Sequence, residues 1–248
     1  MAFCLIIMSS TCIAEDAATY FDRLGVKLYS SGNYREALAL FNQALDQDSS
    51  QADIWAHKGN ALRALRNYNS SVISFKKAID LKGDNQASWS GLRDTYIASK
   101  DYTNASVAAA QAVSLNPKDK YAIVVEGQVM QLQGKFYDAK AKFDQALALD
   151  PKYRDALYRK AISLMAEGNA SQAIVLLDQA LVVDPKFKQA YNAKGLAMEM
   201  AGQQKGSENA YDSALQIDPG WNQPQSNKMH TYLAQNRMEE AMKIFVKL

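Results

Sequence analysis

Four of the five prolines in this chain are evenly spaced along the sequence. They follow one another at intervals of 34 residues: Pro117, Pro151, Pro185 and Pro219. The residues around two of them also repeat, since Asp-Pro-Lys-Tyr at 150–153 returns as Asp-Pro-Lys-Phe at 184–187. A fixed period of this length indicates a chain built from stacked units, each too small to bury its apolar face alone.

The period continues through most of the chain without insertion or deletion. Counting in steps of 34 from Ala18 gives six full blocks and a seventh that stops at its position 27: 18–51, 52–85, 86–119, 120–153, 154–187, 188–221 and 222–248. A constant phase over this length predicts a stacked array, because a globular helical bundle needs no fixed period.

Small and large residues recur at set positions of the block. Position 8 is Gly in four blocks and position 20 is Ala or Ser in all seven, whereas positions 4 and 24 are mostly aromatic or aliphatic. Positions 4, 8 and 11 share one face of a helix, and positions 20, 24 and 27 share one face of a second helix. We therefore expect a helix pair in each block, with close backbones at the small residues and large side chains filling the space beside them.

Glycine and proline mark the ends of the two expected helices. Position 15 is Gly in four blocks, where a left-handed backbone would end the first helix: Gly32, Gly134, Gly168 and Gly202. Proline at position 32 prevents continuation of the second helix. The repeated Asp-Pro-Lys-aromatic sequence is therefore predicted to be the joint between one helix pair and the next.

This column pattern resembles the tetratricopeptide repeat. In the second block the matching residues are Trp55, Gly59, Leu62, Ser71, Phe75 and Ala78. In the fourth block they are Ile123, Gly127, Met130, Ala139, Phe143, Ala146 and Pro151. The resemblance covers residues 18–248 and implies an all-α, right-handed superhelical solenoid of 34-residue helix–turn–helix repeats over residues 15–248. It also implies a protein-binding scaffold rather than an enzyme.

Two blocks depart from the pattern. The third has Arg93 where a small residue is expected and Ala109 where a ring is expected, changes that either compensate in volume or mark a looser joint. The sixth has Gly206 and Ser207 near the start of its second helix. We expect these two repeats to be the least stable, because a unit of an array depends only on its neighbours.

Residues 1–14 differ from the rest of the chain. They carry no charged side chain, include an apolar run at 2–8, and hold both cysteines, Cys4 and Cys12. The small residues up to Ala14 resemble the cleavage site of a secretory signal peptide, although the usual basic start is missing. We expect an exported or cell-envelope protein. The alternative is a cytoplasmic protein with a hydrophobic N-terminal segment.

The charges and motifs argue against several functional classes. With 28 basic and 26 acidic residues, the net charge of +2 gives no electrostatic reason to expect nucleic acid. The two histidines, His57 and His230, lie in the second and seventh blocks, too far apart to share a metal. No zinc-protease, nucleophile-elbow or phosphate-loop motif occurs. The sequence predicts no enzymatic activity, no cofactor, no metal and no small-molecule substrate.

The resemblance also implies where a partner binds. In similar proteins the first helix of each pair lines a concave face, into which positions 2, 5, 9 and 12 point. These positions are mostly polar in blocks one to three and more apolar in blocks four to six. The predicted partner-binding groove consists of Tyr121, Val124, Gln128, Gln131, Tyr158, Ile162, Met165, Asn192, Leu196 and Glu199.

In this groove the rings and aliphatic chains would anchor a protein or peptide segment. The amides of Gln128, Gln131 and Asn192 would pair with its backbone. The alternative is that some of these side chains pack against neighbouring helices.

Three Asn-x-Ser sequences fall at positions 16–19, the turn within a repeat: Asn69, Asn104 and Asn169. They are acceptors for N-glycosylation if the chain is exported, and otherwise ordinary turn residues.

Residues 238–248 form an apolar end, with Met242, Phe245 and Val246 among few polar side chains. Such a surface favours self-association, so a self-assembling structural protein of the cell envelope is one alternative to an adaptor. A regulatory arm of a separate enzyme is another, by analogy with similar proteins.

Overall fold

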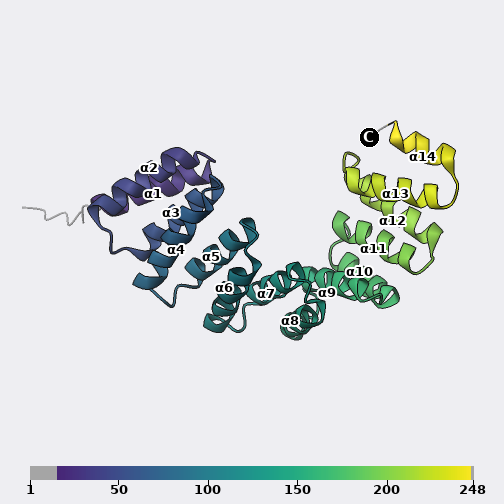
Figure 1. The fold of residues 1–248 in the computed structure, drawn as a ribbon, viewed down its shortest axis with the longest axis horizontal. Helices are drawn as coiled ribbons and strands as arrows, with labels where there is room; N and C mark the ends of the chain where they lie inside the picture. The colour runs from purple at the N-terminus through teal and green to yellow at the C-terminus, as the bar shows by residue number, and fades with distance from the viewer. Residues whose placement is uncertain (1–15, 247–248) are drawn as a thin grey trace, which may run out of the picture. The chain divides into compact units, whose positions relative to one another are not determined.

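The computed structural model describes residues 16–246, and this part of the chain consists of fourteen α-helices without a β-strand (Figure 1). The helices are α1 (Ala17–Ser30), α2 (Tyr34–Gln47), α3 (Ala52–Ala64), α4 (Tyr68–Leu81), α5 (Gln86–Ala98), α6 (Tyr102–Leu115), α7 (Lys120–Leu132), α8 (Phe136–Leu149), α9 (Arg154–Ala166), α10 (Ala170–Val183), α11 (Lys188–Met200), α12 (Gln204–Ile217), α13 (Asn222–Ala234) and α14 (Met238–Phe245). The expected all-α repeat fold is confirmed. The predicted signal sequence at 1–14 lies outside the described residues.

The helix pairs follow the 34-residue blocks. Helix α8 ends at Leu149 and α9 begins at Arg154, so the Asp-Pro-Lys-Tyr sequence at 150–153 is the joint between two pairs, as predicted. Side-chain caps help to start several helices, because a carboxylate accepts a backbone N–H that has no partner within the helix. Asp16 accepts from the N–H of Thr19 at 2.9 Å in this way, and Asp101 accepts from that of Asn104 at 3.1 Å.

Position 15 has a left-handed backbone in every repeat. The four glycines predicted to end the first helix have positive φ angles, from 71° at Gly202 to 83° at Gly32. The other three repeats place Arg66, Lys100 and Asn236 at this position, with φ angles of 61°, 62° and 57°. The turn therefore imposes the left-handed conformation even where the side chain opposes it.

The small residue at position 8 faces the ring at position 24 of the same repeat. A Cβ added to the glycine would lie within 3 Å of that ring in four repeats: 2.5 Å for Gly25 and Phe41, 2.8 Å for Gly59 and Phe75, 2.6 Å for Gly127 and Phe143, and 2.4 Å for Gly195 and Tyr211. In the fifth repeat Ala161 and Leu177 take these places, and both are fully buried. The predicted close approach of the two helices is thus confirmed, with ring size matched to the space available.

The chain divides into two compact units, Met1–Lys100 and Asp101–Leu248. The division falls inside the third repeat, between α5 and α6, and this is the repeat with the unusual Arg93. Arg93 is buried at 1% exposure, with Nε and Nη2 each 2.9 Å from the carboxylate of Asp94. The low stability expected for the third and sixth repeats stays a prediction.

In the second unit the joints are held by a repeated set of three side chains. The first residue of a repeat is a cation that pairs with the Asp at position 31: Lys120 with Asp150, Arg154 with Asp184 at 2.6 Å, and Lys188 with Asp218 at 2.5 Å. The same cation lies over the ring at position 34: Tyr153 at 4.8 Å, Phe187 at 4.5 Å and Trp221 at 5.2 Å. An ion pair and a cation–π contact therefore brace each Asp-Pro-Lys-aromatic joint or its Trp221 counterpart.

A second series of ion pairs links neighbouring repeats of this unit. Lysine at position 7 pairs with aspartate at position 25 of the preceding repeat: Lys160 with Asp144 at 2.5 Å, Lys194 with Asp178 at 2.6 Å, and Lys228 with Asp212 at 2.5 Å.

The first unit uses tryptophan at the joints instead. The indole N–H of Trp55 donates to the carbonyl of Ser49, and that of Trp89 donates to the carbonyl of Gly83, both at 2.9 Å. These bonds satisfy joint carbonyls that no helix ladder reaches.

Candidate functional site

The predicted groove residues all lie in the second unit, on the first helices α7, α9 and α11. Their exposure differs widely. The ring of Tyr121, near the start of α7, is 57% exposed, whereas Val124, one turn further on, is buried at 3%. Gln128, Gln131, Ile162, Met165 and Leu196 are half-buried. Tyr121 therefore offers the most accessible ring of the predicted groove, and Val124 offers no surface to a partner.

The apolar residues of α9 are shared between core and surface. Tyr158, Ile162 and Met165 pack against a buried cluster that includes Leu164 and Phe187. The ring of Tyr158 meets that of Phe187 edge-on, with their centroids 5.0 Å apart. Each of these side chains thus stabilises the repeat with one side and leaves part of its surface open.

Two of the three amides already have partners within the protein. The Nε2 of Gln131 donates to the carbonyl of Arg159 at 2.8 Å and to the hydroxyl of Ser163 at 2.9 Å. The Oδ1 of Asn192 accepts from the Nδ2 of Asn227 at 2.9 Å. These bonds tie α7 to α9 and α11 to α13, so both amides help to position the first helices.

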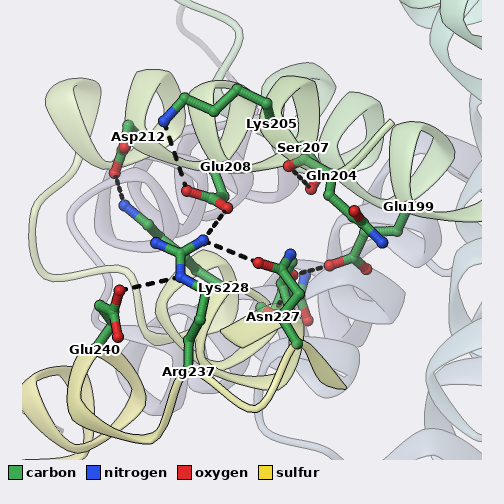
Figure 2. Close-up of polar contacts among 12 residues, drawn as sticks. Glu199, Gln204, Lys205, Ser207, Glu208, Asp212, Asn227, Lys228, Arg237 and Glu240 are labelled. Atoms are coloured by element: carbon green, nitrogen blue, oxygen red, sulfur yellow. Dashed lines mark hydrogen bonds and ion pairs between the residues drawn. The ribbon is translucent and has the colours of Figure 1, made fainter. Parts of the chain in front are cut away.

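Glu199, labelled in Figure 2, lies at the end of α11. It accepts a hydrogen bond from the hydroxyl of Thr231 on α13. Burial raises the pKa of its carboxyl group. The carboxylate lies beside an open pocket of about 320 Å³ that is also lined by Gln204, His230 and Gln235.

Figure 2 also shows a charged cluster that joins the last two repeats. Glu208 of α12 is buried at 5% exposure and lies 2.5 Å from Arg237, the residue before α14. Arg237 also binds Glu240 at 3.0 Å, and the exposed Lys205 lies 3.8 Å from Glu208. Because every charge in this cluster has a partner of opposite sign, we interpret the cluster as a structural clamp that holds α12 and α14 together.

A cation that the sequence pattern did not single out lies beside the groove residues. Arg159 follows Tyr158 on α9 and is half-buried, and burial lowers the pKa of its guanidinium. Position 6 was not among the expected groove positions. The one feature of the sequence that could have indicated Arg159 is its place in a helix start that also contains tyrosines.

Two exposed apolar surfaces lie outside the predicted groove. On α10, Val182 is 83% exposed and borders an open pocket of about 850 Å³ that Pro151, Leu157 and Val175 also line. On α14 and just after it, the exposed residues are Met238, Met242, Phe245 and Val246. Both surfaces are alternatives to the predicted groove as places where a protein could bind.

The three sequence acceptors for glycosylation, Asn69, Asn104 and Asn169, are exposed at the starts of α4, α6 and α10. Within residues 16–246 no group of His, Cys, Asp and Glu side chains is arranged to hold a metal. His57 instead lies 2.7 Å from Asp22 through its Nδ1. None of the helices in the described range has the length and apolar character needed to cross a membrane.

Comparisons with known proteins agree with this geometry. Two family models, both described as tetratricopeptide repeat, match residues 23–86 and 131–197. No curated protein sequence matches the chain.

Three solved structures illustrate the likeness. A tetratricopeptide repeat protein from Parabacteroides merdae has a TM-score of 0.79 at 15% identity, over 93% of this chain and 91% of that one. PilW, a type IV pilus biogenesis factor, has a TM-score of 0.74 at 16% identity, over 86% and 99%. YrrB, described as having an unusual peptide-binding site, has a TM-score of 0.58 at 17% identity, over 76% and 97%. At these identities the likeness establishes the fold.

Proposed function

This chain belongs to the tetratricopeptide repeat family, and from that premise we propose that it is a non-catalytic adaptor that binds a protein or peptide segment on the first helices of its fourth to sixth repeats. The family fold supports a protein-interaction scaffold in general. The placement of the binding surface on the fourth to sixth repeats is the specific part of the proposal.

The observation that carries this proposal is a set of incompletely buried apolar side chains on three consecutive first helices. Tyr121 on α7, Tyr158 and Ile162 on α9, and Leu196 on α11 each keep accessible surface. Aromatic and aliphatic side chains of this kind anchor partners, because their contact area is large and little conformational entropy is lost. The peptide-binding site attributed to YrrB, a structure of the same fold, agrees with such a use.

Site-specific photo-crosslinking tests the proposal. A benzophenone amino acid is placed at Tyr121 in the full chain, and in separate samples at Tyr137 and Val182. Tyr137 is a matched control, because it is an exposed tyrosine (78%) on the second helix of the same repeat. Illumination of native cell extracts should yield a specific adduct from position 121 and not from 137.

The variant Tyr121→Asp should then prevent capture of the same partner, whereas Tyr137→Asp should not. Circular dichroism would show that both remain folded. Adducts from position 182 in place of 121 would move the binding surface to the outer face of α10 and contradict the proposal.

Self-association is a second candidate function, favoured by the exposed apolar residues of α14. Helix α14 presents Met238, Met242 and Phe245 to solvent. Light scattering of the full chain over a concentration series tests it. The variant Met238→Glu/Met242→Glu should lower the average mass, and Val107→Glu, an exposed valine on α6, serves as the control. A monomer at every concentration would exclude this function.

Export or association with the cell envelope is the proposed location. It is supported by the apolar sequence of residues 1–14 and by the structural likeness to a pilus biogenesis factor. N-terminal sequencing of the protein from separated cell fractions tests it. Cleavage near Ala14 in an envelope or external fraction is expected, and an intact Met1 in the cytoplasmic fraction would contradict it.

A further inference from the structure

Arg159 differs from every comparable cation in its unit. Nine other Lys and Arg side chains of the described range 101–246 are half-buried, and each lies within 4.0 Å of a carboxylate: Lys120, Lys140, Lys142, Arg154, Lys160, Lys188, Lys194, Lys228 and Arg237. Within the same range Arg159 is the half-buried cation that has no such partner. Partial burial of an unpaired charge costs free energy of folding, so the absence of a partner for Arg159 calls for a structural explanation.

Arg159 lacks a partner because of a residue in the preceding repeat. A polar side chain at position 6 elsewhere meets a polar side chain at position 5 of the preceding repeat. His57 lies 2.7 Å from Asp22, and Asn227 donates to Asn192 at 2.9 Å. For Arg159 the corresponding residue is Val124, which is buried and has no polar atom in its side chain. At the position where other repeats supply a polar partner, Arg159 therefore meets an apolar side chain.

The surroundings of Arg159 favour the binding of an anionic group from a partner. Arg159 directly follows the groove residue Tyr158 on α9, and burial lowers the pKa of its guanidinium. Asp155, one turn earlier on α9, makes no ion pair with Arg159, and its carboxylate is already bound by Arg154 at 2.9 Å. The Gln131 amide holds the backbone carbonyl of Arg159, so this part of α9 is fixed. A half-buried guanidinium on a fixed stretch of helix, without a carboxylate of its own, is suited to bind a carboxylate through two parallel hydrogen bonds.

We infer that Arg159 binds an acidic side chain, Asp or Glu, of the partner segment, next to an apolar residue of that segment held by Tyr121. This inference rests on the proposed adaptor function and specifies the chemistry of the partner. The apolar contact with Tyr121 supplies area, and the ion pair with Arg159 sets the register of the segment along the groove.

The test uses a phage-displayed library of random 12-residue peptides, selected on the full chain. The enriched peptides should share an Asp or Glu at a constant distance from an apolar residue. A synthetic peptide of the enriched sequence should bind about 10- to 100-fold more weakly when that acidic residue is changed to its amide, as expected for a lost charge-assisted bond. The same loss should follow from Arg159→Gln, and combining both changes should add little.

Two further variants sharpen the test. Lys135→Gln removes an exposed cation of the same unit and should leave binding unchanged. Val124→Asp supplies Arg159 with an internal carboxylate, as Asp22 does for His57, and should weaken peptide binding as much as Arg159→Gln does. Thermal unfolding should show that Arg159→Gln is no less stable than the original chain, since no partner in the protein is lost. A merely structural arginine would instead lower the stability when replaced.

Several results would overturn the inference: enriched peptides without a common acidic residue, no enrichment at all, undiminished binding to Arg159→Gln, or binding that depends on a free C-terminal carboxylate instead of an acidic side chain. The adaptor function is judged separately, by crosslinking from Tyr121. Peptides that bind through Tyr121 but ignore Arg159 would leave the adaptor function standing and remove only the acidic partner.

Discussion

Gly91 of α5 lies directly against the ring of Phe75 on α4, and a Cβ at residue 91 would be 2.3 Å from both Cε1 and Cζ. The other side of the ring is occupied by Gly59 of α3, where an added Cβ would be 2.8 Å from Cε2. Phe75 is fully buried between these two helices. A single ring thus joins two neighbouring repeats, and two glycines make room for it.

We expect Gly91→Ala to destabilise the first unit, because the ring cannot move away from the new methyl group without striking α3. Overpacking of this kind costs about 1–3 kcal/mol. Urea unfolding followed by circular dichroism measures the loss. Gly83→Ala is the matched control, because a Cβ there meets nothing closer than the Ile79 carbonyl at 3.7 Å. Equal effects of the two variants would contradict the packing described for Phe75.

Arg66→Gly should stabilise the protein. Arg66 is exposed and has a φ angle of 61°, a conformation that costs a residue with a Cβ more than it costs glycine. After subtracting the entropy that glycine loses on folding, the gain should be about 0.5–1 kcal/mol. The reverse change at the equivalent position, Gly134→Ala, should destabilise by a similar amount. Thermal unfolding of both variants checks the pair, and a loss of stability in Arg66→Gly would show that its side chain is needed.

The braced joints of the second unit should weaken in acid. The hydrogen bond from the paired cation holds the pKa of Asp150, Asp184 and Asp218 below its ordinary value. A carboxyl group with a lower pKa in the folded chain stabilises the fold above its unfolded pKa of about 3.9 and loses this contribution as pH falls through the folded value.

The stability of the second unit should therefore fall as pH is lowered below about 4. The triple variant Asp150→Asn/Asp184→Asn/Asp218→Asn should lose less over the same range, because Asn keeps an acceptor but does not titrate. Urea midpoints from pH 7 to acid pH compare the two chains. Parallel curves would show that these three pairs do not contribute to the pH dependence.

Arg237→Ala should destabilise the last two repeats, because it leaves the buried carboxylate of Glu208 without its closest cation. Lys205→Ala should have little effect, since Lys205 is exposed and its ammonium is 3.8 Å from Glu208. The double variant Arg237→Ala/Glu208→Gln should recover much of the loss by removing the stranded charge. Hydrogen exchange in α12 and α14 reports the local effect, and equal protection in Arg237→Ala and the original chain would rule out the clamp.

The repeat fold was predictable from the sequence because its determining contacts are local. Gly127 and Phe143 are 16 residues apart, at positions 8 and 24 of one block, and they meet as the column pattern required. The joint at 150–153 and the left-handed Gly134 were predictable for the same reason, since each depends on residues within one turn of the chain. The left-handed backbone of Arg66 was not, because there the turn between α3 and α4 imposes a conformation that its own side chain disfavours.

The sequence alone therefore determined the period and the helix pairs, whereas the partner surface on the first helices was an expectation from the family resemblance. Only the tertiary structure decided which side chains on those helices are free. Gln131 has the type of side chain that a groove needs, but Arg159 and Ser163 occupy it. Arg159 is left without a partner because Val124, 35 residues earlier, is apolar. The position of a residue in the repeat predicts its type. Whether its side chain is free to bind a partner depends on which side chains of the adjacent repeat contact it, and the stacking of the repeats decides those contacts.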